Sequence, residues 1–207
     1  MPTETTITLY TYDELSDSAK ETAKQWWLDC RDETDYESTI DDFKTIAELM
    51  GVSFKTHPVT LMSGATRYDA NIWWSLGYSQ SDYAAFEGTM TYAKGMAKAV
   101  RDYAPQDTVL HALADRIAAL HARTFYRSAY VVTYHHYYGT QAEPSEFDWT
   151  DGAHERAEEI KEIAKDLGRW LYDRLRDEDE YLRSDEQIAD AMEANGYTFR
   201  EDGRRED

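Results

Sequence analysis

The chain has 207 residues, of which 41 are acidic and 22 basic, so its formal net charge at pH 7 is −19. A charge of this sign and size repels nucleic acid and anionic membrane surfaces, and it attracts basic surfaces, which in a cell are mostly nucleic-acid-binding sites. The abundance of Tyr and Trp excludes a disordered chain, the single cysteine excludes an internal disulfide framework, and the length suffices for one well-buried core.

The N-terminal part predicts two helices between short strands. Residues 5–12 (TTITLYTY) are β-prone and favour an edge strand. Ser16 is a good N-cap for a helix over residues 17–30, because its hydroxyl can accept a hydrogen bond from the first turn. A second helix is expected over residues 36–51, where a glycine ends it, and residues 52–59 favour a strand.

The aromatic stretch 68–92 predicts a β-hairpin. Two runs rich in aromatic and β-branched residues lie on either side of the short polar segment 79–82. Because alternate side chains of a strand share a face, the first run places Ile72, Trp74 and Leu76 together. Such an apolar face needs a cover, and the amphipathic helices elsewhere in the chain can supply it.

The middle of the chain predicts two helices, a strand and a loop. Residues 93–103 favour a short helix that a following Ala-Pro pair stops. Asp107 or Thr108 can cap the next helix, which ends around residue 124. Residues 125–138 favour a long strand, and residues 141–148 are polar and indicate a loop.

The C-terminal part contains the longest helical segment, residues 151–181, with an apolar stripe at i, i+3, i+4 spacing. Ser184 caps a short helix to about residue 194, residues 197–199 favour a last strand, and the tail 201–207 is expected to be frayed. These elements predict an α+β fold with one domain over residues 1–207. Its core is an antiparallel sheet of about four strands packed against several helices.

Three stretches resemble a widespread group of uncharacterised phage and prophage proteins, some of which are labelled antitoxins of toxin–antitoxin stability systems. Residues 10–16 (YTYDELS) resemble the opening of that group, and residues 180–186 (EYLRSDE) its C-terminal Tyr-Leu-x-Ser-Asp-Glu stretch. Residues 79–88 (SQSDYAAFEG) resemble its Ser-Gln-Gly-Asp-Gly-Ala-Ser-Phe-x-Gly signature, in which Ser81 and Tyr83 stand where the group has glycine. The resemblance covers nearly the whole chain and implies phage or prophage origin and one continuous domain, but no established activity.

The sequence carries no pattern typical of an enzyme. It has neither a glycine-rich phosphate loop nor a Gly-x-Ser-x-Gly nucleophile elbow. Cys30 lies among carboxylates, whose negative charge disfavours the thiolate that a nucleophile needs. We therefore expect a protein that is not an enzyme, with no catalytic residue and no cofactor.

Metal and direct nucleic-acid binding are equally unsupported. His135 and His136 are consecutive on a predicted strand and point to opposite faces, and the other histidines lack zinc spacing. The carboxylates of residues 32–37 are close together, but their spacing does not match a calcium-binding EF-hand loop. Aromatic residues that stack on bases are normally accompanied by a basic groove, whereas Lys and Arg are scattered and outnumbered here. We expect no metal site and no direct contact with nucleic acid.

The acidic residues are concentrated in two segments, 29–42 and 151–180. B-DNA carries about one charge per 1.7 Å of axis, and a helical turn of about 5.4 Å offers roughly two outward carboxylates. Two acidic elements side by side therefore approach the charge density of a duplex. The predicted partner-binding residues are Asp32, Glu33, Asp35, Glu37, Asp41, Asp42, Glu155, Glu158, Glu159, Glu162, Asp166, Asp173, Asp177 and Glu178.

These residues favour the hypothesis of an acidic DNA mimic. In this interpretation a phage-encoded inhibitor occupies the DNA-binding site of a host defence protein with a basic surface, such as a restriction or CRISPR component. The alternatives are an antitoxin-like or regulatory protein-binding module, whose epitope would be the aromatic hairpin, and an enzyme. No signal peptide and no apolar run of roughly 20 residues is evident. The host cytoplasm is the expected location, without membrane binding, and a homodimer stays open.

Overall fold

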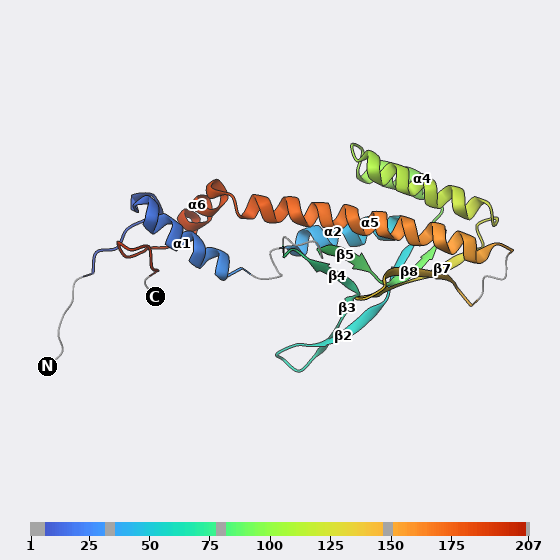
Figure 1. Cartoon of the computed structure of the whole chain (residues 1–207), viewed down its shortest axis with the longest axis horizontal. Helices are drawn as coiled ribbons and strands as arrows, with labels where there is room; N and C mark the ends of the chain where they lie inside the picture. The colour runs from blue at the N-terminus through green and yellow to red at the C-terminus, as the bar shows by residue number, and fades with distance from the viewer. Residues whose placement is uncertain (1–6, 32–35, 78–81, 147–150, 206–207) are drawn as a thin grey trace. The chain divides into compact units, whose positions relative to one another are not determined.

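The computed structural model of the chain (Figure 1) describes residues 7–31, 36–77, 82–146 and 151–205. Contacts group the chain into two compact units. The first comprises residues 1–37 and 176–207, and the second residues 38–175. Each unit is described by itself, and the single domain expected over residues 1–207 stays a prediction.

The second unit is built on a four-stranded antiparallel sheet, which confirms the predicted α+β class. The strand order is β1 (Val52–Phe54), β6 (Gly88–Thr91), β7 (Ala129–His135) and β8 (Gly139–Pro144). Along β7, Tyr130 and Val132 are fully buried, whereas Val131 between them is 39% exposed. One face of the sheet therefore faces the core and the other faces solvent.

Two further pairs of strands extend the second unit. β2 (Thr56–Thr60) pairs with β3 (Thr66–Ala70), and this ribbon extends away from the other strands (Figure 1). β4 (Ile72–Ser75) pairs with β5 (Tyr83–Phe86), which confirms the predicted hairpin around residues 79–82. The turn residues 78–81 themselves lie outside the described residues.

Three antiparallel pairs, β1–β6, β2–β3 and β4–β5, meet at a ring of three backbone hydrogen bonds. The amide of Lys55 donates to the carbonyl of Glu87 (2.9 Å), that of Glu87 to Asn71 (2.9 Å), and that of Asn71 to Lys55 (2.7 Å). Each of these residues separates two strands that the sequence predicted as one continuous run. The buried Asn71 side chain donates to the Glu87 carboxylate at 2.6 Å, so the polar centre of this junction is satisfied internally.

Four helices pack on this framework: α2 (Glu37–Leu49), α3 (Met96–Tyr103), α4 (Thr108–Ala122) and α5 (Ala153–Leu182). Asp107 caps α4 as predicted, since its carboxylate accepts from the Leu110 amide at 3.0 Å. Gly51, with φ of +86°, follows α2 where a left-handed residue is needed. These local signals explain why the helix ends agree with the sequence.

The centre of the core joins α2, α5 and the strands through aromatic rings. The ring of Phe43 lies 5.8 Å from that of Phe86 and 6.5 Å from the indole of Trp170. Gly168 allows α5 to lie close against β5. A Cβ atom at this position would lie 2.4 Å from the Ala84 carbonyl oxygen. A glycine is therefore required for this close approach of helix and strand.

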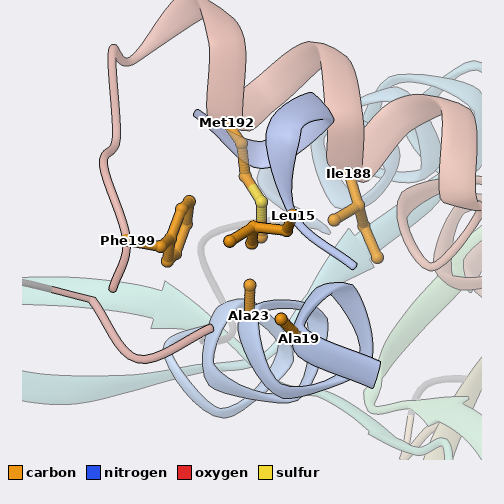
Figure 2. Packing of buried hydrophobic residues seen from close by; sticks show 6 residues of the cluster. All are labelled: Leu15, Ala19, Ala23, Ile188, Met192 and Phe199. Carbon is orange, nitrogen blue, oxygen red and sulfur yellow. The ribbon is translucent and has the colours of Figure 1, made fainter. Parts of the chain in front are cut away.

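The first unit has its own small core (Figure 2). It contains a 3₁₀ turn (Tyr12–Glu14), α1 (Asp17–Asp29), the C-terminal end of α5 and α6 (Asp185–Ala194). Buried side chains from α1, from α6 and from the residues before and after them pack together in the cluster Leu15, Ala19, Ala23, Ile188, Met192 and Phe199. Ser16 and Ser184 cap α1 and α6 as predicted.

Several predicted boundaries were wrong. The strand expected from residue 125 begins at Ala129, because Phe125 and Tyr126 adopt φ of +51° and +63°, which no strand accommodates. The first half of the polar loop expected at 141–148, residues 141–144, belongs to β8, which pairs with β7 and buries Ala142, and residues 147–148 lie outside the described residues. The described part of 5–12 forms one bridge, Tyr10 to Phe199, instead of a strand.

The tail also differs from the frayed end expected over residues 201–207. Gly203 is buried, and a Cβ atom there would lie 2.0 Å from the carbonyl oxygen of Ala19 on α1. The guanidinium of Arg205 lies 4.6 Å from the centre of the Tyr197 ring. Up to Arg205 the tail therefore packs on the first unit.

Candidate functional site

The predicted acidic residues on α2 lie on its exposed side. Glu37, Asp41 and Asp42 are exposed, whereas Asp32, Glu33 and Asp35 lie outside the described residues. The ammonium of Lys44 lies 2.8 Å from Asp41. The hydroxyl of Tyr103 donates to Asp42 at 2.6 Å, and this hydrogen bond raises the pKa of the phenol.

The acidic residues on α5 form a line along the exposed side of the helix. Glu155, Glu159, Glu162 and Asp166 follow one another at intervals of three or four residues, so they share a face, and Glu158 lies beside them. All of these are exposed or half-buried. The structure thus brings five of the predicted residues together in the second unit.

Arg116 of α4 and Arg123, which directly follows this helix, neutralise part of this line. Arg123 donates two hydrogen bonds to Glu159, at 2.9 and 2.5 Å, and Arg116 donates to Asp166 at 2.6 Å. The hydrogen bonds from Arg123 hold the pKa of Glu159 below its usual value. These pairs between helices could not be foreseen from the sequence.

Two lysines within α5 neutralise further charges. Lys161 pairs with Glu158, and the ammonium of Lys165 lies 2.8 Å from Glu162. Within the described residues, Glu155 and Asp173 have no ion-pair partner. Asp177 and Glu178 belong to the part of α5 in the first unit. The predicted site is therefore exposed, but it carries less free charge than the residue count indicates.

A cleft of about 680 Å³ opens beside α5, next to the line of acidic residues. It lies between β5, the end of β7, the start of β8 and the residues Lys165 to Asp173 of α5. Its walls carry an arginine, a lysine, a histidine, three tyrosines and two aspartates among small residues. This volume is within the range of roughly 300–1,000 Å³ that is usual for small-molecule sites.

Two stacked tyrosine rings line the cleft. The Tyr83 and Tyr134 rings lie 5.0 Å apart with an interplanar angle of 22°. Burial, helped by the hydrogen bond with Tyr83, raises the pKa of Tyr134 to about 12. Asp82 accepts from the Gly77 amide at 3.0 Å and so closes the end of the hairpin loop.

The sequence analysis did not predict this cleft, although the sequence contains two signals of it. Residues 82–85 of the stretch 79–88, which carries the family resemblance, line it directly. Lys165, Arg169 and Asp173 recur every four residues and therefore share one side of α5. Both signals were interpreted separately, as a hairpin turn and as part of a charged helix.

Metal binding and membrane insertion receive no support from the structure. In the part of the chain that the structure describes, no group of three or more His, Cys, Asp or Glu residues could hold a metal ion. Among the same residues, no helix has the length and apolarity that crossing a membrane requires.

The fold and the exposed carboxylates together define an α+β protein with an acidic helical surface and an adjacent cleft. A family model described as "Domain of unknown function (DUF8835)" matches residues 36–185. The chain belongs to this family, which agrees with the expectation of an uncharacterised family. No curated protein and no solved structure matches the chain.

Proposed function

We propose that the chain is a phage-encoded, non-catalytic binding protein that occupies the nucleic-acid site of a basic host defence protein. The observation that carries the proposal is the line of exposed carboxylates on α5 from Glu155 to Asp166. The exposed Asp41 and Asp42 of α2 add to the acidic surface of the same unit. The host cytoplasm is the compartment in which such a partner is met.

The spacing of these carboxylates supports a partial imitation of one DNA strand. Glu155 and Asp166 are 11 residues apart, which corresponds to about 16 Å of helix and one carboxylate per roughly 5–6 Å. One DNA strand carries a phosphate per about 3.4 Å of axis. The line therefore carries somewhat more than half as many carboxylates per unit length as a strand carries phosphates, although internal Arg and Lys residues pair with three of its four members.

The ion pairs with α4 are compatible with this proposal. Glu159 and Arg123 are each 50% exposed at the side chain, and Asp166 and Arg116 are similarly open. Exposed pairs of this kind contribute only about 0–1 kcal/mol. A basic group of a partner can therefore share or replace the internal arginine. Side chains that are already held also lose less conformational entropy on binding.

The test uses a charge-matched pair of variants. The first neutralises four acids of α5 in the form Glu158→Gln, Glu159→Gln, Glu162→Gln and Asp166→Asn. The control neutralises four exposed acids elsewhere in the second unit, in the form Glu48→Gln, Asp102→Asn, Asp115→Asn and Glu143→Gln. Both variants lose the same charge, so long-range repulsion and attraction change equally.

Affinity capture from host lysate identifies the partner, and inhibition of its DNA binding is then measured with each variant. We expect the α5 variant to lose inhibition and the control to keep most of it. We also expect binding to weaken steeply as salt rises from about 50 to 500 mM, because screening shortens the reach of charge. A stable ternary complex with DNA would refute mimicry. A captured toxin without nucleic-acid binding would favour the antitoxin-like alternative.

A further inference from the structure

The cleft beside α5 is lined by charged residues that acidic mimicry does not explain. Lys165, Arg169 and Asp173 line it at successive turns of the helix, about 6 Å apart. The row therefore begins with two cations and ends with an acid about 12 Å away. In a chain of net charge −19, two adjacent cations facing a cleft are an unexpected local feature.

Arg169 is the key group, because it is not used by the fold. It is exposed, and within the described residues it has no hydrogen bond or ion pair. Among the same described residues, Lys165 has only the pair with Glu162, in which the lysine side chain is 43% exposed. An exposed pair within one helix is weak, so this ammonium is also available to a ligand.

The rest of the cleft suits a planar, partly polar group. The stacked pair of Tyr83 and Tyr134 forms an aromatic wall, and Tyr172 lines the cleft from α5. Ala84 and Ala85, which have small side chains, also line the cleft. Rings of this kind stack on nucleobases with little dependence on the base.

We propose that this cleft binds a nucleoside phosphate. Arg169 and Lys165 bind the phosphate, which a guanidinium recognises through paired hydrogen bonds. The base lies against the tyrosine wall. Asp173 accepts hydrogen bonds from sugar hydroxyls or from an exocyclic amine of the base. The cleft volume of about 680 Å³ accommodates a ligand of this size.

The acidic charge of the chain does not prevent the binding of such an anion. Charges more than a Debye length away, about 8 Å at physiological ionic strength, are largely screened. Arg169 and Lys165 act at hydrogen-bond distance. Asp82 and Asp173 in the cleft walls and Glu162 beside Lys165 oppose a phosphate at short range, so the two cations must outweigh them, whereas the distant carboxylates mainly slow its approach.

The experiment is calorimetric titration of the full chain with the four nucleoside 5′-monophosphates, with adenosine and with inorganic phosphate. The variant Arg169→Ala is compared with Arg127→Ala, which removes an exposed arginine outside the cleft. Thermal melting of both variants verifies that the fold is intact. Arg169→Lys tests whether a charge without the guanidinium fork is sufficient.

We expect at least one mononucleotide to bind, with adenosine and inorganic phosphate each about tenfold weaker or more. Arg169→Ala should weaken nucleotide binding by about tenfold or more, Arg169→Lys less, and Arg127→Ala not measurably. The proposal is wrong if no mononucleotide binds at millimolar concentration, or if Arg169→Ala binds like the unmodified chain. Equal affinity for adenosine and its monophosphate would also overturn it, because the cations would then contribute nothing.

Discussion

Trp170 provides the most direct test of how α5 is held in the second unit. Its indole is 7% exposed and lies 6.5 Å from the ring of Phe43. The indole N–H donates to the Asp107 carboxylate at 2.8 Å, and that same aspartate caps α4. One side chain thus connects α5 with α2 and with the start of α4.

Two substitutions of Trp170 should separate the contributions of packing and of the hydrogen bond to the free energy of unfolding. Trp170→Ala leaves a cavity, and core substitutions of this size cost about 3–5 kcal/mol. Trp170→Phe keeps most of the packing but loses the charged hydrogen bond, which corresponds to about 1.5–3 kcal/mol. For a domain of this size, each kcal/mol lowers Tm by about 2–4 °C. The expected decreases in Tm are therefore about 6–20 °C for alanine and about 3–12 °C for phenylalanine.

Trp73→Ala is the matched control for these measurements. Trp73 is 37% exposed and stacks on His57, so its loss should cost only about 0.5–1.5 kcal/mol. Urea unfolding followed by circular dichroism gives the free energies for all three variants. If Trp170→Ala were no more destabilising than Trp73→Ala, the packing of α5 described above would be wrong. If Trp170→Phe were neutral, the hydrogen bond to Asp107 would contribute nothing.

Three further predictions concern buried or half-buried polar groups. Asp179→Ala should destabilise the first unit by about 3–5 kcal/mol, because the mostly buried Arg31 loses its carboxylate partner at 3.2 Å. Urea unfolding measures this loss of stability, and a loss below about 1 kcal/mol would contradict the prediction. The pKa of Tyr134 is raised to about 12, so the contribution of its neutral phenol to stability is complete below pH 10 and is lost as pH rises towards 12. In an absorbance titration, Tyr134→Phe should show one fewer late-titrating tyrosine than the unmodified chain. Burial opposes the charge of Glu87, but hydrogen bonds from Asn71 and other donors outweigh it and lower the pKa. Its contribution is therefore present above pH 4.5 and is lost at lower pH, so the stability gap between Glu87→Gln and the unmodified chain should narrow there.

The elements that the sequence predicted well are those with local signals. Ser16, Asp107 and Ser184 each cap the helix that follows, because a cap depends on a few neighbouring residues. The hairpin around residues 79–82 likewise follows from two apolar runs and a short polar turn. Predictions of this kind need no knowledge of distant parts of the chain.

The elements that were missed depend on distant partners. β8 has a polar sequence and becomes a strand because β7 supplies its hydrogen bonds and the core buries Ala142. The division of each hairpin arm at Asn71 and Glu87 results from a junction of three segments far apart in sequence. The cleft is missed for the same reason, since its walls come from β5, β7, β8 and α5. Spacing within one element indicates a face, but only the fold determines what that face meets.

The acidic surface shows the same distinction between composition and arrangement. Even if every Lys and Arg formed an ion pair, 19 of the 41 acidic residues would stay unpaired. The fold does not change this excess, but it brings four cations into ion pairs with the α5 acids that were predicted to bind a partner. These cations are Arg123, Arg116, Lys161 and Lys165. Two roles for the acids follow. A general excess accelerates the approach to a basic partner, whereas specific contacts slow dissociation.

Association kinetics with the captured partner separate these two roles. The α5 variant and its charge-matched control lose the same number of charges, so both should reduce the association rate constant similarly. Only the α5 variant should raise the dissociation rate constant, because it leaves basic groups of the partner desolvated and unpaired. If both variants changed only association, the α5 acids would act as general charge and not as contacts. The binding face would then have to be sought elsewhere, first at the exposed acids Asp41 and Asp42 of α2.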